Sequence, residues 1–239
     1  MIPGFVYAAL AAAADVAGGL VVTTRIRHSQ ATLNTLVGFG AGFMLSVAIL
    51  EMLPHAVEVE NGFFAVLIGY LAVHLTQHVL TPHFHFGEET HSDAMSSRGV
   101  GVWALVGLIP HSFFDGVAIV GGYLVSAEVG FLVFVAVLLH KIPTGVSLAS
   151  IMLASGNTVR STIVAVTALA LATLLGALVT PALGVLENYG LALAAGVTIY
   201  VAASNLIPES QQAHGWFVQA AVFVGVLGFA LIRTLLPGH

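Results

Sequence analysis

Two apolar stretches of the sequence each carry a pair of polar side chains four residues apart. One stretch contains His111 and Asp115, and the next contains His140 and Thr144. Residues four apart lie on the same face of a helix, so each stretch presents an imidazole beside an oxygen-bearing side chain. Imidazole and carboxylate groups suit zinc and related divalent metals. The spacing therefore predicts a metal site made by two helices.

Each of these stretches also contains a proline, Pro110 or Pro143. A proline inside a helix leaves the carbonyl four residues earlier without its N–H donor and usually kinks the helix. At membrane depth such backbone is tolerated only where it faces protein or water. We therefore expect the two helices to line a wet cavity beside the metal site.

Three charged side chains, Glu51, Asp115 and Lys141, lie within apolar stretches. An ionised side chain at the centre of a membrane helix costs about 2.5 to 3.5 kcal/mol, so each of them needs a partner or a function. One interpretation without metal is a buried ion pair of Asp115 with Lys141, both imidazoles being bonded to backbone. That interpretation does not account for the repeated four-residue spacing.

Further polar side chains lie in the other apolar stretches. Glu51 and His55 are four apart around Pro54, where they either bind metal at a pore mouth or reach headgroup water. Asn205 near the end of a later stretch could supply an amide oxygen. Asp15 is a lone carboxylate in the first stretch, and the sequence assigns it no role.

The composition indicates an integral membrane protein. Of 239 residues, 58% are hydrophobic and 7% are charged, whereas a soluble domain has roughly 25% charged residues. Six Lys and Arg residues cannot form a basic face, so nucleic acid is excluded as a partner and the lipid bilayer is the expected surrounding. Cysteine is absent, so any metal must be bound by nitrogen and oxygen.

The chain divides into eight apolar runs long enough to span a bilayer, and we predict a single all-α membrane domain over residues 1–239. The expected spans are 3–24, 31–56, 62–80, 99–124, 128–153, 159–181, 189–208 and 215–236. One connector is long: residues 81–98 contain His83, His85 and His91 and form either a solvated linker or a weak metal site. In the third span, His74 and His78 are expected to form a polar face packed in the bundle rather than a metal or haem site.

Positive charges near helix ends favour the cytoplasmic side. Arg25, Arg27, Arg98 and Arg160 lie in the first, third and fifth connectors, and Arg233 alone lies on the opposite side. Both termini are therefore predicted to be extracytoplasmic, and the connector 81–98 to be cytoplasmic.

Four segments resemble the ZIP (Zrt/Irt-like) metal transporters. HSFFDG at 111–116 is similar to the motif of that family's fourth helix, and HKIPTG at 140–145 is similar to the motif of its fifth. GFMLSVAILEMLPHA at 42–56 and YVAASNLIPE at 200–209 look like its second and seventh helices. The resemblance implies eight helices with both termini outside, in agreement with the distribution of positive charge.

In that family the two motif helices hold neighbouring metal sites. The resemblance implies one site at His111, Asp115 and His140, and a second at Ser112, Asp115 and Lys141. A protonated lysine cannot coordinate a metal, so we predict a single ion.

Two residues depart from the family pattern. Thr144 stands where a further ligand is usual, and Asn205 stands where an acidic residue is common, so both are predicted to line the pathway rather than to bind the ion. Three protein ligands leave a position open for water or for Glu51.

The resulting hypothesis is transport of a divalent metal into the cytoplasm, most of all Zn(II), with Fe(II), Mn(II) and Cd(II) as further candidates. The resemblance implies that the fourth and fifth helices move against a scaffold in a homodimer in the plasma or inner membrane. No prosthetic group is expected. The alternative is a membrane zinc hydrolase, although no HExxH motif is present and Glu51 is the one plausible deep base.

Overall fold

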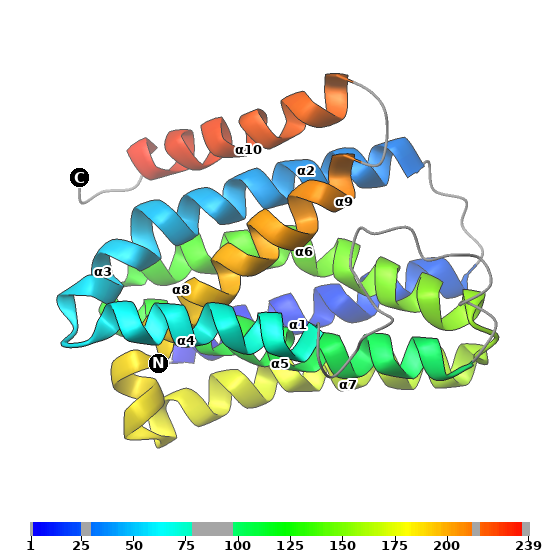
Figure 1. Ribbon diagram of the computed structural model, residues 1–239, viewed down its shortest axis with the longest axis horizontal. Coiled ribbons are helices and arrows are strands. Elements are labelled where there is room, and N and C mark those ends of the chain that lie inside the picture. Colours follow the sequence, from blue (N-terminus) through cyan, green and yellow to red (C-terminus); the bar gives the residue numbers. More distant parts are fainter. Residues whose placement is uncertain (1, 25–29, 78–97, 212–215, 236–239) are drawn as a thin grey trace.

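The structure is a computed structural model that describes residues 2–24, 30–77, 98–211 and 216–235. In these ranges every regular element is helical, and the helices pack in one elongated bundle (Figure 1). The α-helices are α1 (Ile2–Thr23), α2 (Gln30–Val47), α3 (Leu53–Glu58), α4 (Gly62–Leu75), α5 (Arg98–Val125), α6 (Ala127–Ala154), α7 (Val159–Val179), α8 (Gly184–Tyr200), α9 (Ile207–Gln211) and α10 (Trp216–Leu235).

Six helical segments of the described part are long and apolar enough to cross a bilayer. They are Ile2–Thr23, Asn34–Glu58, Arg98–Val125, Ala127–Ala154, Val159–Ala182 and Gly184–Leu206. Two shorter apolar segments, Gly62–Leu75 and Gln219–Leu235, lie where the third and eighth spans were expected. The chain is thus an all-α membrane protein. The connector 81–97 and His78 lie outside the described residues.

A π-helical turn interrupts each of two long helices. Residues Ala48–Met52 follow α2, and residues Val201–Leu206 follow α8. A proline comes two residues after each turn, in the similar sequences VAILEMLP (47–54) and VAASNLIP (201–208). Glu51 and Asn205 occupy the same position of these sequences. Both residues lie inside a π turn, which widens the helix and changes the direction of its side chains.

Glycine holds the tightest helix crossings together. In four pairs of helices, each partner contributes a glycine whose added Cβ would overlap a backbone carbonyl oxygen of the other. These glycines are Gly18 and Gly145 for α1 with α6, Gly116 and Gly176 for α5 with α7, Gly42 and Gly225 for α2 with α10, and Gly69 and Gly196 for α4 with α8. Small residues allow backbones of membrane helices to approach closely and to gain dispersion contacts.

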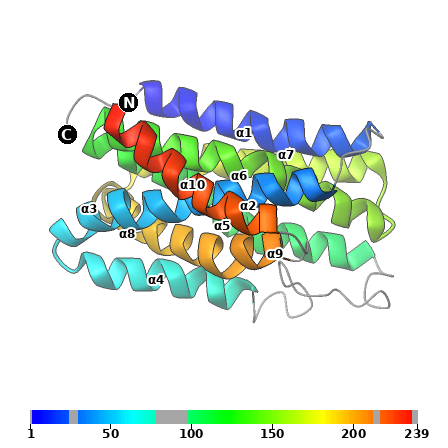
Figure 2. The same cartoon turned by 90° about the horizontal axis from the view of Figure 1, so that it is seen from above.

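The four pairs form two blocks of helices. Helices α1, α5, α6 and α7 pack on one another in the first block, and α2, α4, α8 and α10 belong to the second (Figure 2). The blocks meet through α2 with α6 and through α5 with α8. At the contact of α2 with α6, a Cβ at Gly40 would lie 3.4 Å from the Leu139 carbonyl oxygen, which is van der Waals contact rather than overlap.

The glycine crossings give a test of this packing. We expect Gly145→Ala to lower the stability of the protein by about 1 to 3 kcal/mol or more, because its Cβ overlaps the Asp15 carbonyl oxygen and forces α1 away from α6. Thermal unfolding in detergent measures the loss. Gly184→Ala is the matched control, since a Cβ there meets no atom within 4 Å. Equal melting temperatures for the two variants would contradict the close packing.

Candidate metal centre

Helices α5 and α6 form a hairpin that is fastened at both ends. Ser126 alone connects them, and its hydroxyl accepts a hydrogen bond from the Val129 N–H at 3.1 Å, which caps α6. At the opposite end, the Asn157 side-chain amide donates to the Arg98 carbonyl, and the Arg98 guanidinium donates to the Gly156 carbonyl, both at 3.1 Å. Side chains at the middle of the hairpin are therefore held in a fixed register.

Three side chains of types that can bind a metal ion meet at that position. His111 and Asp115 of α5 and His140 of α6 each offer a donor atom, and these atoms lie within 4.8 Å of one another. The Asp115 Oδ2 atom is 3.4 Å from the Nε2 atom of each histidine. The three residues are at most 2% exposed. Ligands at about 2.0 to 2.2 Å from a tetrahedral zinc ion lie about 3.3 to 3.6 Å apart, so the spacing fits such an ion.

The hydrogen bond of His140 leaves one ring nitrogen available for metal. Its Nδ1 lies 3.0 Å from the Ala136 carbonyl oxygen, which can only accept, so Nδ1 carries the proton. In the neutral ring Nε2 then has a free lone pair, and this lone pair faces the Asp115 carboxylate. Two acceptors 3.4 Å apart are favourable only with a cation between them. A backbone carbonyl that orients a ligating histidine is common in metal sites.

His111 has a different environment. Its Nε2 faces Asp115, while its Nδ1 is buried and has no hydrogen-bond partner in the described part of the chain. A buried polar atom without a partner costs about 1 to 3 kcal/mol, and such costs are concentrated at functional sites. The ring is thus held by packing.

Lys141 lies directly beside the three clustered side chains, with three oxygen atoms close to its ammonium nitrogen. Its Nζ atom is 2.9 Å from Asp15 Oδ2, 3.0 Å from Asp115 Oδ2 and 2.9 Å from Ser112 Oγ. The side chain is fully buried. The resemblance implied a second metal site at Ser112, Asp115 and Lys141. In the structure, the ammonium of Lys141 places a positive charge at that position.

Asp15 of α1 is the partner of Lys141 that sequence reasoning missed. The carboxylate is fully buried, and the close crossing of Gly18 and Gly145 presses α1 onto α6 around it. The signal was present, because Asp15 and Lys141 are opposite charges in separate apolar stretches and each needs compensation in a membrane. Spacing along one helix could not reveal a pair from two helices far apart in sequence.

Pro143 and Thr144 of α6 have separate roles. The Thr144 hydroxyl donates to the His140 carbonyl at 2.8 Å, so this side chain is bonded to its own helix. Pro143 has no N–H for the Leu139 carbonyl, four residues earlier. That carbonyl oxygen lies at the contact with Gly40 of α2, and so the released backbone group lies at the boundary of the two blocks.

Glu51 and Asn205 lie outside the three-residue cluster. Glu51 is 4% exposed, and its Oε1 atom is 2.8 Å from the Nε atom of Arg233 in α10. The Asn205 amide nitrogen donates to the side-chain oxygen of Gln77 at 3.1 Å. His55 lies in α3, and its Nδ1 atom is 3.7 Å from a carboxylate oxygen of Glu58. Metal binding by Glu51 stays a prediction.

His74 of α4 packs against aromatic side chains. Its ring centroid is 5.9 Å from that of Tyr200 in α8, at an interplanar angle of 73°. Tyr200 also packs edge-on against Tyr70, at 5.0 Å. His74 is nevertheless exposed, so the structure does not confirm the expected polar face packed within the bundle at this residue.

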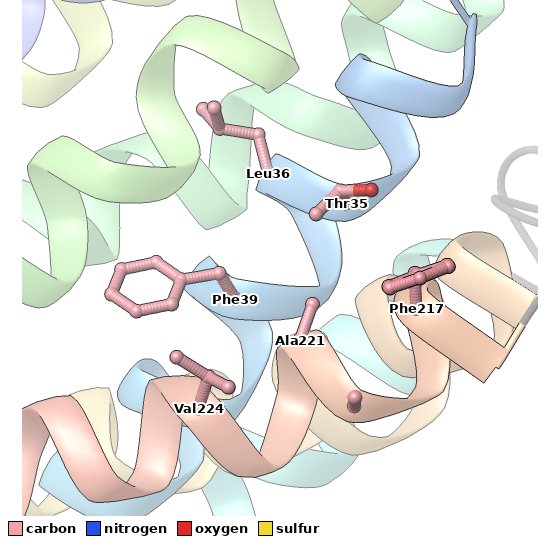
Figure 3. Close-up of a pocket in the computed structure, with 7 residues that line it drawn as sticks. Thr35, Leu36, Phe39, Phe217, Ala221 and Val224 are labelled. Atoms are coloured by element: carbon pink, nitrogen blue, oxygen red, sulfur yellow. The ribbon is translucent and has the colours of Figure 1, made fainter.

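A large apolar groove lies between α2 and α10, away from the metal cluster (Figure 3). It encloses about 590 Å³ and is lined by Thr35, Leu36, Phe39, Phe217, Ala220, Ala221 and Val224. No titratable side chain is among these residues, so the groove has no ligand for a metal ion.

Comparison with known proteins agrees with this geometry. The family model described as ZIP zinc transporter matches residues 87–235, which is more than half of the chain. Zinc transporter ZupT of Enterobacter sp. (strain 638) is 31% identical over 121 residues, 46% of each chain. Zinc transporter YKE4 of Saccharomyces cerevisiae is 23% identical over 215 residues, 76% of this chain and 62% of the relative.

Zinc transporter ZIP9 of Micropogonias undulatus is 29% identical over 157 residues, which cover 61% of this chain and 50% of the relative. The chain thus spans between 46% and 62% of the length of these relatives. The matched region of the family model includes both motif helices and all three clustered ligands. The chain therefore belongs to the ZIP zinc transporter family.

Proposed function

We propose that this protein carries divalent transition metal ions, most of all zinc, across the membrane into the cytoplasm through one intramembrane site. The observation that carries the proposal is the buried cluster of His111, Asp115 and His140, whose 3.4 Å spacings suit a tetrahedral ion. The relatives described as zinc transporters support zinc as the ion. Iron(II), manganese(II) and cadmium(II) are further substrates of the same ligand chemistry.

The ion loses water to the three side chains and leaves when the first helix block shifts against the second. The pattern of glycine contacts supports this division. Within each block, a Cβ added at the paired glycines would overlap a backbone carbonyl oxygen of the neighbouring helix, whereas at the α2 contact with α6 a Cβ at Gly40 would lie at van der Waals distance from the Leu139 carbonyl oxygen. The released Leu139 carbonyl lies at this boundary, and a polar group there favours a wetted path.

The site holds a single ion. Lys141 already supplies a positive charge within 3.0 Å of Asp115 and Ser112, so a second divalent cation there would meet a fixed like charge. The fourth coordination position belongs to water or to Glu51. For Glu51 to bind, its carboxylate must first leave Arg233.

We propose eight spans in one membrane domain of residues 1–239, with both termini extracytoplasmic. The shorter helices α4 and α10 are the third and eighth spans. The start of α1 and the end of α10 lie at the same end of the bundle, as an even number of spans requires (Figure 2). The protein is a homodimer in the plasma or inner membrane, and Thr144 and Asn205 border the ion pathway.

A membrane zinc hydrolase is the competing function. Membership of a transporter family argues against an enzyme. The one deep carboxylate considered as a general base, Glu51, is 2.8 Å from the guanidinium of Arg233 and lies outside the cluster of His111, Asp115 and His140. Metal transport is therefore the better account of the site.

Asp115→Ala tests the transport site. The variant lacks the carboxylate that faces both imidazoles, so zinc uptake into proteoliposomes should fall by more than about a hundredfold. Loss of a residue that only hydrogen-bonds a metal ligand usually costs about ten- to a hundredfold. Uptake of labelled zinc is the measurement. Ser46→Ala, which alters a buried hydroxyl bonded within α2, is the control and should transport normally. Wild-type uptake by Asp115→Ala would refute the site, and turnover of a lipid or peptide without uptake would favour the hydrolase.

Lys141→Glu tests the single-ion proposal. Replacing the ammonium with a carboxylate places a new ligand beside Ser112, Asp115 and Asp15, so the purified variant should bind two zinc ions instead of one. Metal analysis of the purified protein gives the ratio. Lys141→Met removes the charge without adding a ligand and should keep one ion. A ratio that stays at one in Lys141→Glu contradicts the proposal.

A further inference from the structure

Asp15 is a buried carboxylate outside the cluster of His111, Asp115 and His140. It lies on α1, is fully buried, and its Oδ2 atom is 2.9 Å from Lys141 Nζ. Its other oxygen, Oδ1, has no hydrogen-bond donor in the described part of the chain. The ion pair is therefore the contact that compensates this charge, and a buried carboxylate at such a cost calls for a function.

The ammonium of Lys141 and the metal ion depend on the same oxygen atom. Lys141 Nζ is 3.0 Å from Asp115 Oδ2, and this same Oδ2 faces Nε2 of both histidines at 3.4 Å. A lysine paired with Asp115 alone would neutralise the one anionic ligand of the site. The ion would then bind two neutral imidazoles and a carboxylate whose charge is already compensated, which weakens binding of a divalent cation.

Asp15 changes this balance. Lys141 is nearly equidistant from the two carboxylates, at 2.9 and 3.0 Å, so Asp15 takes a share of its charge. The group of Asp15, Lys141 and Asp115 carries one net negative charge, and one net positive charge once a divalent ion is bound. Without Asp15 the bound state would carry two net positive charges in a bilayer. Burial of uncompensated charge is costly in such surroundings.

The packing of α1 keeps Asp15 at this position. A Cβ at Gly145 would overlap the Asp15 carbonyl oxygen, and a Cβ at Gly18 would overlap that of Ile142. The α1 backbone is thus in direct contact with the α6 turn that carries Lys141, so Asp15 belongs to the same rigid block as the site.

We propose that Asp15 is a positioning residue for metal binding: by pairing with Lys141 it keeps Asp115 available as the anionic ligand and sets the net charge of the site. This inference rests on the proposed function, since it assigns Asp15 to the transport site. It predicts an effect through charge and not through the shape of the side chain.

The test is a charge cycle of three variants: Asp15→Asn, Lys141→Met, and the two combined. Asp15→Asn keeps the shape but leaves Lys141 to Asp115, so zinc affinity should fall about ten- to a hundredfold, the usual effect of losing a partner of a ligand. The combined variant restores the wild-type net charge and should recover most of that loss. Zinc titration of the purified proteins and the KM for zinc uptake in proteoliposomes are the readouts.

Two controls separate the possible outcomes. Thr173→Val changes a buried hydroxyl of α7 without changing charge and should bind zinc like the wild type. Asp115→Ala reports on the transport site itself, so uptake that survives there refutes the proposed function. If Asp115→Ala is inactive and Asp15→Asn binds zinc normally, the inference about Asp15 is wrong. If the combined variant binds zinc as weakly as Asp15→Asn, Asp15 acts through the packing of α1, and the inference is overturned. The same conclusion follows if neither Asp15→Asn nor the combined variant folds.

Discussion

The contact on which the rest of the site depends is the one between Lys141 and Asp115. Their charged atoms lie 3.0 Å apart inside a bundle with few charged residues. In such surroundings a carboxylate without a partner would cost on the order of several kcal/mol of free energy to bury. A carboxylate whose charge is fully neutralised by one lysine would bind a metal ion weakly. The bundle adds a second carboxylate for Lys141 from α1, and it directs two neutral imidazoles at the same Asp115 oxygen, Oδ2, that the lysine contacts.

This arrangement requires several helices to be held at fixed distances. Ser126 and the Arg98 and Asn157 contacts set the register of α5 against α6, and reciprocal glycines set the distance of α1 from α6. Without a hydrophobic drive between helices in lipid, such close backbone contact supplies much of the association energy. The same device recurs in the second block, while at the α2 contact with α6 a Cβ at Gly40 would lie at ordinary van der Waals distance.

The motif helices and their ligands could be predicted from sequence because the information is local. His111 with Asp115 follows from helical spacing within one apolar run, and His140 with Thr144 follows in the same way from the next, while the resemblance implied that His140 joins the first pair. The partners of Lys141 and Glu51 could not be predicted in this way. Asp15 and Arg233 lie far from them along the chain, so only the packing of α1 and α10 brings each pair together. The π turns at Glu51 and Asn205 were also missed, since apolar periodicity does not distinguish them from α-helix.

X-ray absorption at the zinc edge of the zinc-loaded protein would report how many zinc ions are bound and which atoms ligate them. We predict one zinc ion with two imidazole nitrogens and a carboxylate oxygen at about 2.0 to 2.2 Å. A further oxygen donor, from water or Glu51, should occupy the fourth position. The imidazole scattering should disappear in part when His111 or His140 is replaced. A spectrum without imidazole scattering, or with a second zinc ion near the first, would contradict the account.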